Sequence, residues 1–265
     1  MATGDAATFY ADHWREIEEE RIARYEAMFV WRPEQDALLA PAEIATGQRV
    51  LDLGCGPGFL ALALAEKVGP HGRVCGADIN ARFVADATRR AREKSLEHVS
   101  FHHLQSERLP FDDGSFDRAL AKNVLEYVPD LAGTLAELHR VLAPGGKLHV
   151  IDSDWGFVIV EPWGKATVDR FFAAAGPAFK EPYVGRKAPA AMRVAGFRSV
   201  DVRLLPIVDR DGRLLPVLRN MQSYIRTFAT LPDAEAEGLL RDVTDAVGHG
   251  TYFGCLPQFL ITATR

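Results

Sequence analysis

Three alternating glycines lie between an apolar run and a segment of helical composition. They are Gly54, Gly56 and Gly58, in the sequence VLDLGCGPGFLAL at 50–62. Glycine permits backbone conformations that a Cβ would oppose, and it lets a ligand lie against the main chain. A dinucleotide fingerprint would place a third glycine where Phe59 stands, and the adjacent Asp52 would repel a pyrophosphate. The loop therefore predicts a ligand without phosphates, and a P-loop is excluded because no Gly-Lys-Ser/Thr follows.

A second ligand signal ends the next apolar run, where Asp78 is followed by Ile79. A carboxylate at that point can accept two hydrogen bonds from a ribose diol, and an apolar neighbour can cover an adenine face. The pair favours a nucleoside with an unphosphorylated ribose. Such an acid alone is weak support, since NAD enzymes also use one and a structural role remains open.

The elements that must position these residues follow an alternating pattern. Short apolar runs alternate with amphipathic stretches, as in a parallel sheet with crossover helices. We predict strands at 48–53, 72–78, 99–104, 116–121 and 146–152, with helices near 58–68, 80–94 and 130–142. The last of these helices is predicted to be capped by Asp130 and ended by Pro144-Gly145-Gly146.

The pattern changes after residue 153. We expect a helix near 186–195, a late strand in GFRSVDVRLLPIV and a final strand around 255–264. The stretches 155–185 and 207–252 are too long for plain connections, so with residues 1–35 they are predicted to form a cap over the carboxyl edge of the sheet. We therefore divide the chain into a helical cap segment (1–47), a cofactor-binding core (48–153) and cap insertions with the last strands (154–265).

The amino-acid composition and the net charge disfavour several classes of protein. The 265 residues are 48% hydrophobic and 25% charged, with a net charge of −5, which is typical of a globular protein and disfavours nucleic acid as a partner. Three cysteines without metal-ligand spacing predict no metal site and fit a reducing compartment. No apolar run is long enough for a signal peptide or a membrane span, so we expect a cytoplasmic protein.

These motifs together resemble class I S-adenosylmethionine-dependent methyltransferases, in the branch of ubiquinone/menaquinone-type and other small-molecule enzymes. The matching segments are VLDLGCGPG, GADIN, the stretch 105–130 and ELHRVLAPGGKLHVID at 137–152. The resemblance implies a Rossmann-like α/β fold, with a seven-stranded, mostly parallel sheet, helices on both faces and a partly helical cap. It also implies S-adenosyl-L-methionine as the cofactor.

The same resemblance assigns residues to the cofactor. Those expected at it are Tyr25, Asp52, Gly54, Cys55, Gly56, Gly58, Phe59, Asp78, Ile79, Gln105, Ser106, Glu107 and Asn123. Asp52 and the glycine loop would surround the methionine part, and Asn123 would meet its amino group. Gln105 replaces a carboxylate that many relatives present to the adenine amine, so we expect weaker binding there.

The acceptor side is less determined. A hydroxyl or carbon acid would need a base near the methyl group. Our candidate is Asp154, which directly follows the fifth strand, although a turn or cap role remains open. His249, in GHGTYFG, is a second candidate with a structural alternative. Aromatic residues in the cap favour a small, fairly apolar acceptor of quinone, polyketide, terpenoid or alkaloid type.

Other functions remain open from the sequence. The chain could methylate a protein, or bind the cofactor without methyl transfer, as a pericyclase-like or regulatory protein. The aromatic residues of the N-terminal segment also suggest a homodimer.

Overall fold

The computed structural model describes residues 8–17 and 19–265, and a seven-stranded sheet lies at its centre. The strand order is β3-β2-β1-β4-β5-β10-β7, in which β10 runs antiparallel to both neighbours and the other pairs are parallel. The strands are β1 (Arg49–Leu53), β2 (Arg73–Asp78), β3 (Val99–His103), β4 (Phe116–Lys122), β5 (Leu142–Ser153), β7 (Arg198–Leu205) and β10 (Gln258–Thr264). The predicted mostly parallel, Rossmann-like sheet is confirmed.

Helices cover both faces of this sheet. One apolar core joins α5 (Leu131–Val141) and α7 (Val184–Val194) to one face, and another joins α3 (Phe59–Val68) to the opposite face. Helix α4 (Ala81–Glu93) packs against β2 and β3. Buried leucine, valine and alanine side chains supply these contacts, which is why the strands read as nearly continuous apolar runs.

Two details at α5 differ from expectation. Asp130 lies at the N-terminal flank of the helix, but its side chain makes no capping hydrogen bond. The helix ends at Val141, and β5 begins at once at Leu142, so the Pro-Gly-Gly segment lies inside the strand rather than directly ending the helix. Pairing of Leu142 with Phe116 of β4 explains the early start of the strand.

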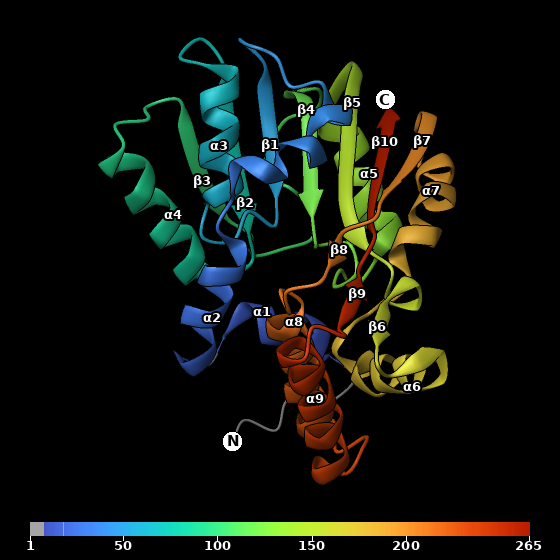
Figure 1. Cartoon of the computed structure of the whole chain (residues 1–265). Helices are drawn as coiled ribbons and strands as arrows, with labels where there is room; N and C mark the ends of the chain where they lie inside the picture. The colour runs from blue at the N-terminus through green and yellow to red at the C-terminus, as the bar shows by residue number, and fades with distance from the viewer. Residues whose placement is uncertain (1–7, 18) are drawn as a thin grey trace.

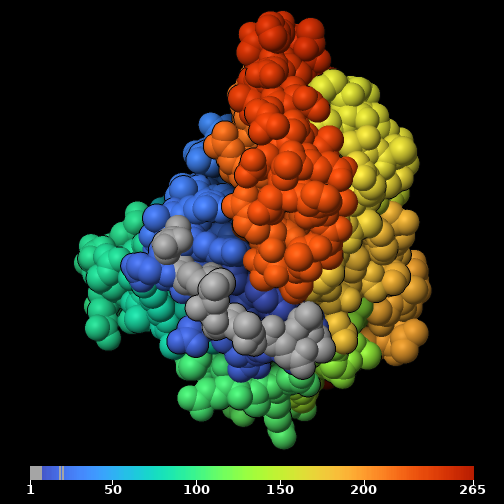
Figure 2. Space-filling model, turned by 90° about the horizontal axis from the view of Figure 1, so that it is seen from below, coloured from blue at the N-terminus to red at the C-terminus, as the bar shows by residue number. Residues whose placement is uncertain are grey.

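The remaining helices gather beyond the carboxyl ends of the parallel strands (Figure 1). They are α1 (Phe9–Arg15), α2 (Glu19–Phe29), α6 (Gly164–Ala175), α8 (Leu215–Phe228) and α9 (Asp233–Gly248). Figure 2 shows this side of the molecule from below, with the blue atoms of the described N-terminal residues beside the orange-red C-terminal helices. An aromatic-rich core holds α6, α8 and α9 together.

Short elements connect this cap to the central sheet. A three-stranded sheet has the order β6 (Ile159–Glu161), β9 (Phe253–Cys255) and β8 (Val208–Asp209). The 3-10 turns are η1 (Pro33–Leu38), η2 (Ala40–Ala42), η3 (Trp155–Phe157) and η4 (Gly176–Ala178). The expected irregular stretch 155–185 thus contains a 12-residue helix, α6. The expected final strand is two strands, separated at Leu256-Pro257.

Within the described part of the chain, no helix combines the length and the apolar character needed to cross a membrane.

Candidate functional site

A cavity of about 450 Å³ is lined by residues at the carboxyl ends of the strands and by residues of the cap. The glycine loop after β1 and the end of β2 form one part of its wall. Its aromatic lining comes from both the core and the cap, and consists of Tyr10, Trp14, Tyr25, Phe29, Trp31, Phe59, Phe83, Tyr127 and Trp155. The cavity is therefore a mainly apolar chamber with a few polar groups at defined points.

The glycine loop turns sharply into α3 with positive φ angles at all three glycines. A Cβ on Gly56 would meet nothing closer than Phe29, 3.8 Å away, so this residue opens toward the cavity. A Cβ on Gly58 would lie 2.7 Å from the Ala87 Cβ, and Gly58 is absent from the cavity wall. Gly58 thus serves the close packing of α4 on the loop, while Gly56 leaves room for a ligand.

Asp78 is fixed by backbone amides at the carboxyl end of β2. Its Oδ2 accepts a hydrogen bond from the Gly56 N–H (2.7 Å), and its Oδ1 accepts one from the Asn80 N–H (2.8 Å). Burial raises the pKa of this carboxyl, although the two amides and His103 oppose the rise. Each oxygen keeps a further acceptor position, so Asp78 can still receive hydroxyl donors from the cavity.

Two buried oxygens in the cavity wall have no hydrogen-bond partner among the residues that the structure describes. They are Asp52 Oδ2 and Asn123 Oδ1. Burial, followed by the nearby Asp78 charge, raises the pKa of Asp52 to about 8. Asn123 has a left-handed backbone (φ 53°), a conformation that costs energy outside glycine and often accompanies function. Unsatisfied buried acceptors are costly, so both positions suit a ligand with N–H donors.

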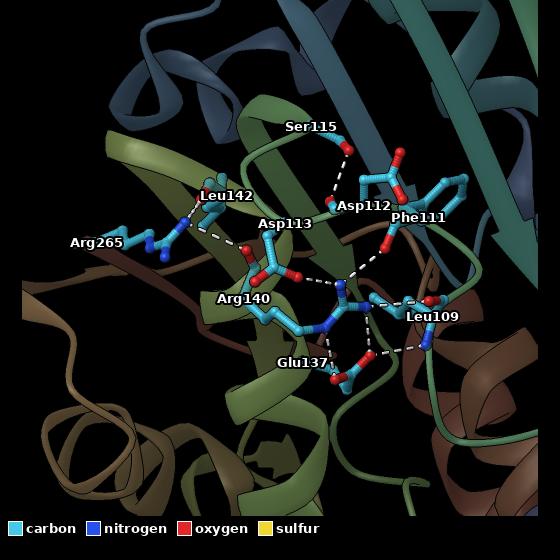
Figure 3. A network of polar contacts seen from close by, with 9 residues as sticks. All are labelled: Leu109, Phe111, Asp112, Asp113, Ser115, Glu137, Arg140, Leu142 and Arg265. Atoms are coloured by element: carbon cyan, nitrogen blue, oxygen red, sulfur yellow. Dashed lines mark hydrogen bonds and ion pairs between the residues drawn. The ribbon is translucent and has the colours of Figure 1, made fainter.

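The loop after β3 borders the cavity through Ser106 and Glu107, and Arg140 of α5 holds it in place (Figure 3). The Arg140 guanidinium donates to the carbonyls of Leu109 (3.1 Å) and Phe111 (2.8 Å). It also pairs with the carboxylates of Glu137 and Asp113, each at 2.8 Å. Glu137 in turn accepts from the Leu109 N–H (2.9 Å). Arg140, in the RVL segment at the end of α5, thus fixes the position of this loop.

The N-terminal helices close the cavity on the other side. The Asn80 amide donates to the Trp14 carbonyl (2.9 Å), and Glu26 pairs with Arg90 of α4 (2.9 Å). Tyr25 is almost fully buried, and its hydroxyl lies 3.1 Å from that of Tyr224 in α8. Further hydrogen bonds join the Tyr25 hydroxyl to His13 (2.8 Å) and Asn220 (3.3 Å). These helices therefore contact both the nucleoside end of the cavity and α8.

Most of the residues expected at the cofactor do line the cavity. Those in its wall are Tyr25, Asp52, Gly54, Cys55, Gly56, Phe59, Asp78, Ile79, Ser106, Glu107 and Asn123. Gly58 and Gln105 do not, and Gln105 is exposed.

The candidate base Asp154 does not line the cavity. Its side chain is fully buried and forms a two-point ion pair with the Arg186 guanidinium, with both contacts at 2.6 Å. Arg186 also stacks on the rings of Phe157 and Tyr183, at 5.1 and 5.0 Å from their centres. Asp154 Oδ1 additionally accepts from the Gly156 N–H. The carboxylate therefore holds η3 and α7 together and is turned away from the acceptor side, contrary to our expectation.

His249 also lies away from the cavity. It is an exposed residue at the C-terminal end of α9, and the cavity wall does not include it. Because it is exposed and lies outside the described wall, this imidazole is not placed to contact a molecule in the cavity.

Among the cavity residues that the sequence analysis missed, two charged ones lie at and after the end of β4. Glu126, after β4, is 2% exposed, and its Oε2 accepts a hydrogen bond from the Trp155 indole N–H (2.7 Å). Burial and then the neighbouring Asp152 raise the pKa of Glu126 well above its usual range. The other is Lys122, the last residue of β4. Both residues belong to the segment KNVLEY, at the end of an apolar strand. A charged residue at the end of such a strand led us to Asp78, and the same argument could have identified these two.

Within residues 8–17 and 19–265, no three His, Cys, Asp or Glu side chains are arranged as metal ligands would be.

Comparisons with known proteins agree with this geometry. A family model described as "Methyltransferase domain" matches residues 44–176, half of the chain. A Streptomyces fradiae protein, described as an uncharacterized 37.1 kDa protein in transposon TN4556, is 29% identical over 238 residues, covering 88% of this chain and 67% of that one. A demethylmenaquinone methyltransferase of Listeria welshimeri is 33% identical over 149 residues. That match covers 56% of this chain and 61% of the relative, so the chain spans less than two thirds of it.

Solved structures share the fold. The phosphoethanolamine N-methyltransferase 2 of Haemonchus contortus, in complex with S-adenosyl-L-methionine, superposes with a TM-score of 0.65 at 18% identity. The superposition covers 97% of this chain and 60% of that one. With the motifs, the sheet order and the family match in agreement, the chain belongs to the methyltransferase-domain family of class I enzymes, whose methyl donor is S-adenosyl-L-methionine.

Proposed function

We propose that the protein transfers the methyl group of S-adenosyl-L-methionine to a small, largely apolar acceptor. The observation that carries the proposal is the aromatic cavity of about 450 Å³ that directly adjoins the glycine loop. The bound cofactor supplies an activated methyl group on a positively charged sulfur, and a neutral thioether leaves as the new bond forms. The protein mainly has to align the acceptor within roughly 3–3.5 Å of that methyl group and exclude water.

The polar groups of the wall fit the three parts of the cofactor. Asp78, fixed by two amides, is suited to accept from the ribose hydroxyls, and Ile79 to flank the adenine. The unpartnered oxygens of Asp52 and Asn123 are suited to accept from the ammonium of the amino-acid end. Gly56 leaves room for the chain between them.

Glu126 takes the role first considered for Asp154. Its carboxyl lies in the cavity wall beside Tyr127 and Trp155, where an acceptor would meet it. Because burial raises its pKa, ionised Glu126 is a stronger base than a solvent-exposed carboxylate. It would take a proton from an acceptor hydroxyl or acidic carbon as the bond to the methyl group forms.

The apolar lining indicates the acceptor class. Aromatic side chains at the acceptor end favour flat or polyunsaturated molecules over highly charged ones, since no arginine cluster lies in the described wall of the cavity. The similarity to a demethylmenaquinone methyltransferase is consistent with a quinone-like acceptor. Polyketide, terpenoid and alkaloid acceptors belong to the same class.

A methyl-labelled screen tests this function. We expect the protein to bind S-adenosylhomocysteine in calorimetry and to transfer label from S-adenosyl-L-methionine to at least one phenol, quinol or terpenoid. Transfer only to a protein would replace the small acceptor by a macromolecule. Binding without transfer to any acceptor of the panel would support a non-methylating role, as in a cyclase-like or regulatory protein.

A further inference from the structure

Lys122 is a half-buried lysine whose charge the described residues do not pair. It is the final residue of β4 and borders the cavity. Among residues 8–17 and 19–265, no carboxylate lies within ion-pair distance of its ammonium group, and no hydrogen bond of that group is present. Most other lysines near carboxylates, such as Lys147 with Glu43, form direct pairs on the surface.

The surroundings of Lys122 leave its charge incompletely compensated. Asp152, Asp52 and Glu126 all act on it from a distance and favour the protonated amine. Even so, burial dominates and lowers the pKa of Lys122. Two of these acids keep protons near neutral pH, because their own pKa values are raised to about 8 (Asp52) and about 7 (Asp152). An anion in direct contact with the amine would supply the missing compensation.

Strand order places Lys122 at a defined part of the ligand. The carboxyl ends of β2, β1 and β4 follow one another across the sheet, carrying Asp78, Asp52 and Lys122 in that order. Neighbouring strands lie about 4.8 Å apart, so β2 and β4 are separated by about 10 Å across β1. A nucleoside held at Asp78 that extends over the glycine loop therefore ends near Lys122, which is a span that the sulfonium-linked amino-acid chain can cover.

Asp52 and Lys122 also face the same side of the sheet. Leu120 lies directly beside Asp52 in the β1–β4 register, and Lys122 is two residues further along β4, so all three share one face. The pair thus presents an unpartnered acceptor and a cation within the same part of the cavity. An α-amino acid carries the complementary charges, a donor ammonium and an acceptor carboxylate.

We propose that Lys122 binds the carboxylate at the amino-acid end of the cofactor, while Asp52 Oδ2 accepts a hydrogen bond from the neighbouring ammonium. This inference rests on the cofactor binding included in the proposed function, and is independent of the acceptor. It makes Lys122 a residue that recognises the complete cofactor and discriminates against analogues without the carboxylate.

Calorimetry with two ligands tests the assignment. The probes are S-adenosylhomocysteine and its decarboxylated analogue, which differ only in the group that Lys122 is proposed to contact. The variant is Lys122→Met, which keeps the length and apolar character of the side chain, with Lys122→Gln as a second variant. Lys94→Met, an exposed lysine at the end of α4, is the matched control.

We expect Lys122→Met to weaken S-adenosylhomocysteine binding roughly 10- to 100-fold, the loss expected for a charged hydrogen bond. Binding of the decarboxylated analogue should stay at the wild-type level, which also shows that the variant is folded, and Lys94→Met should change neither. Equal weakening of both ligands in Lys122→Met and Lys122→Gln would overturn the assignment. So would unchanged binding of both, which would direct Lys122 to the acceptor and leave the proposed methyl transfer intact. If the wild-type protein binds neither ligand, the proposed function itself fails.

Discussion

At the scale of single residues, the contacts of a carboxylate decide its role more than its place in the sequence. Asp154 and Glu126 both follow strands at the carboxyl edge of the sheet. Asp154 forms an ion pair with Arg186. Glu126 has no such cationic partner among the described residues, accepts a hydrogen bond from Trp155 and lies in the cavity wall. Low-dielectric surroundings without a paired cation raise the pKa of a carboxyl and make its anion a stronger base.

Glu126→Gln tests the base. The amide keeps the shape of the side chain and can still accept from Trp155, so cofactor affinity should change little. The rate of methyl transfer to a hydroxyl or carbon acid should fall by about 10²- to 10⁴-fold. Wild-type kcat should rise with pH through the raised pKa of Glu126, because the base must be ionised, and the variant should lack this rise. A variant with full activity and the wild-type pH profile would remove Glu126 from the reaction.

Asp154→Asn tests the structural role of the other carboxylate. We expect a loss of about 1–3 kcal/mol in the free energy of unfolding, because the variant loses the ion pair with Arg186 and its amide oxygen can accept only one of the two hydrogen bonds. Turnover per folded molecule should stay near the wild-type value. Asp169→Asn, which removes an exposed pair with Lys165, should cost less than 1 kcal/mol and serves as the control. Urea unfolding and a labelled-methyl assay measure both quantities, and a selective loss of turnover would restore Asp154 as a base.

At the scale of elements, the loop that borders the cofactor site after β3 is held in position by a side chain of the neighbouring helix α5. The loop carrying Ser106 and Glu107 has little regular structure, yet Arg140 of α5 holds two of its carbonyls. The planar guanidinium makes these contacts while pairing with two carboxylates, an arrangement that an ammonium group cannot reproduce.

Arg140→Lys should therefore loosen this loop although it conserves the charge. We expect faster hydrogen exchange of the backbone amides between residues 105 and 113, weaker S-adenosylhomocysteine binding and a loss of about 1–3 kcal/mol in the free energy of unfolding. Mass spectrometry of deuterium uptake locates the change. Arg89→Lys, on the exposed face of α4, should leave exchange in this loop unaltered. Unchanged uptake in Arg140→Lys would show that the loop is held by other contacts.

The sequence analysis predicted the features that are encoded within a few neighbouring residues. The glycine loop, the acid after β2 and the apolar runs carry their meaning within a few residues, and most of the expected cofactor residues do line one cavity. The position of Asp154 outside the cavity wall was not predictable from local sequence, because its partner Arg186 lies 32 residues later in the chain. The helix α6 was hidden in a stretch rich in aromatic residues and proline, and its stability comes from packing against β6 and α8.

At the scale of the whole molecule, the site concentrates acids that keep their protons. Burial raises the pKa of Asp52, Asp78, Asp152 and Glu126. Such groups are ionised in the unfolded chain at neutral pH, so the folded state binds more protons and stability falls as the pH rises. The folded protein is therefore less stable at neutral pH because of acids that lie at the edge of the sheet where the ligand binds.

Urea unfolding of the cofactor-free protein measures this linkage. Between pH 6.5 and pH 8 the free energy of unfolding should decrease, because Asp52 and Asp152 lose their protons through raised pKa values of about 8 and about 7. The window avoids His149, whose lowered pKa of about 4 affects stability only below about pH 6.5. Asp52→Asn should reduce the slope. The same slope in the variant would show that Asp52 titrates normally in the folded chain.

The position of the N-terminal helices has a kinetic consequence. Glu26 pairs them with Arg90 of α4 beside the glycine loop, and Tyr25 joins them to α8, so a single wall borders both halves of the cavity. A cofactor that enters beneath this wall completes the chamber in which the acceptor is held. The two substrates should therefore add in a compulsory order, cofactor first, and the spent cofactor should leave last. Product-inhibition patterns would reveal S-adenosylhomocysteine as a competitor of the cofactor alone.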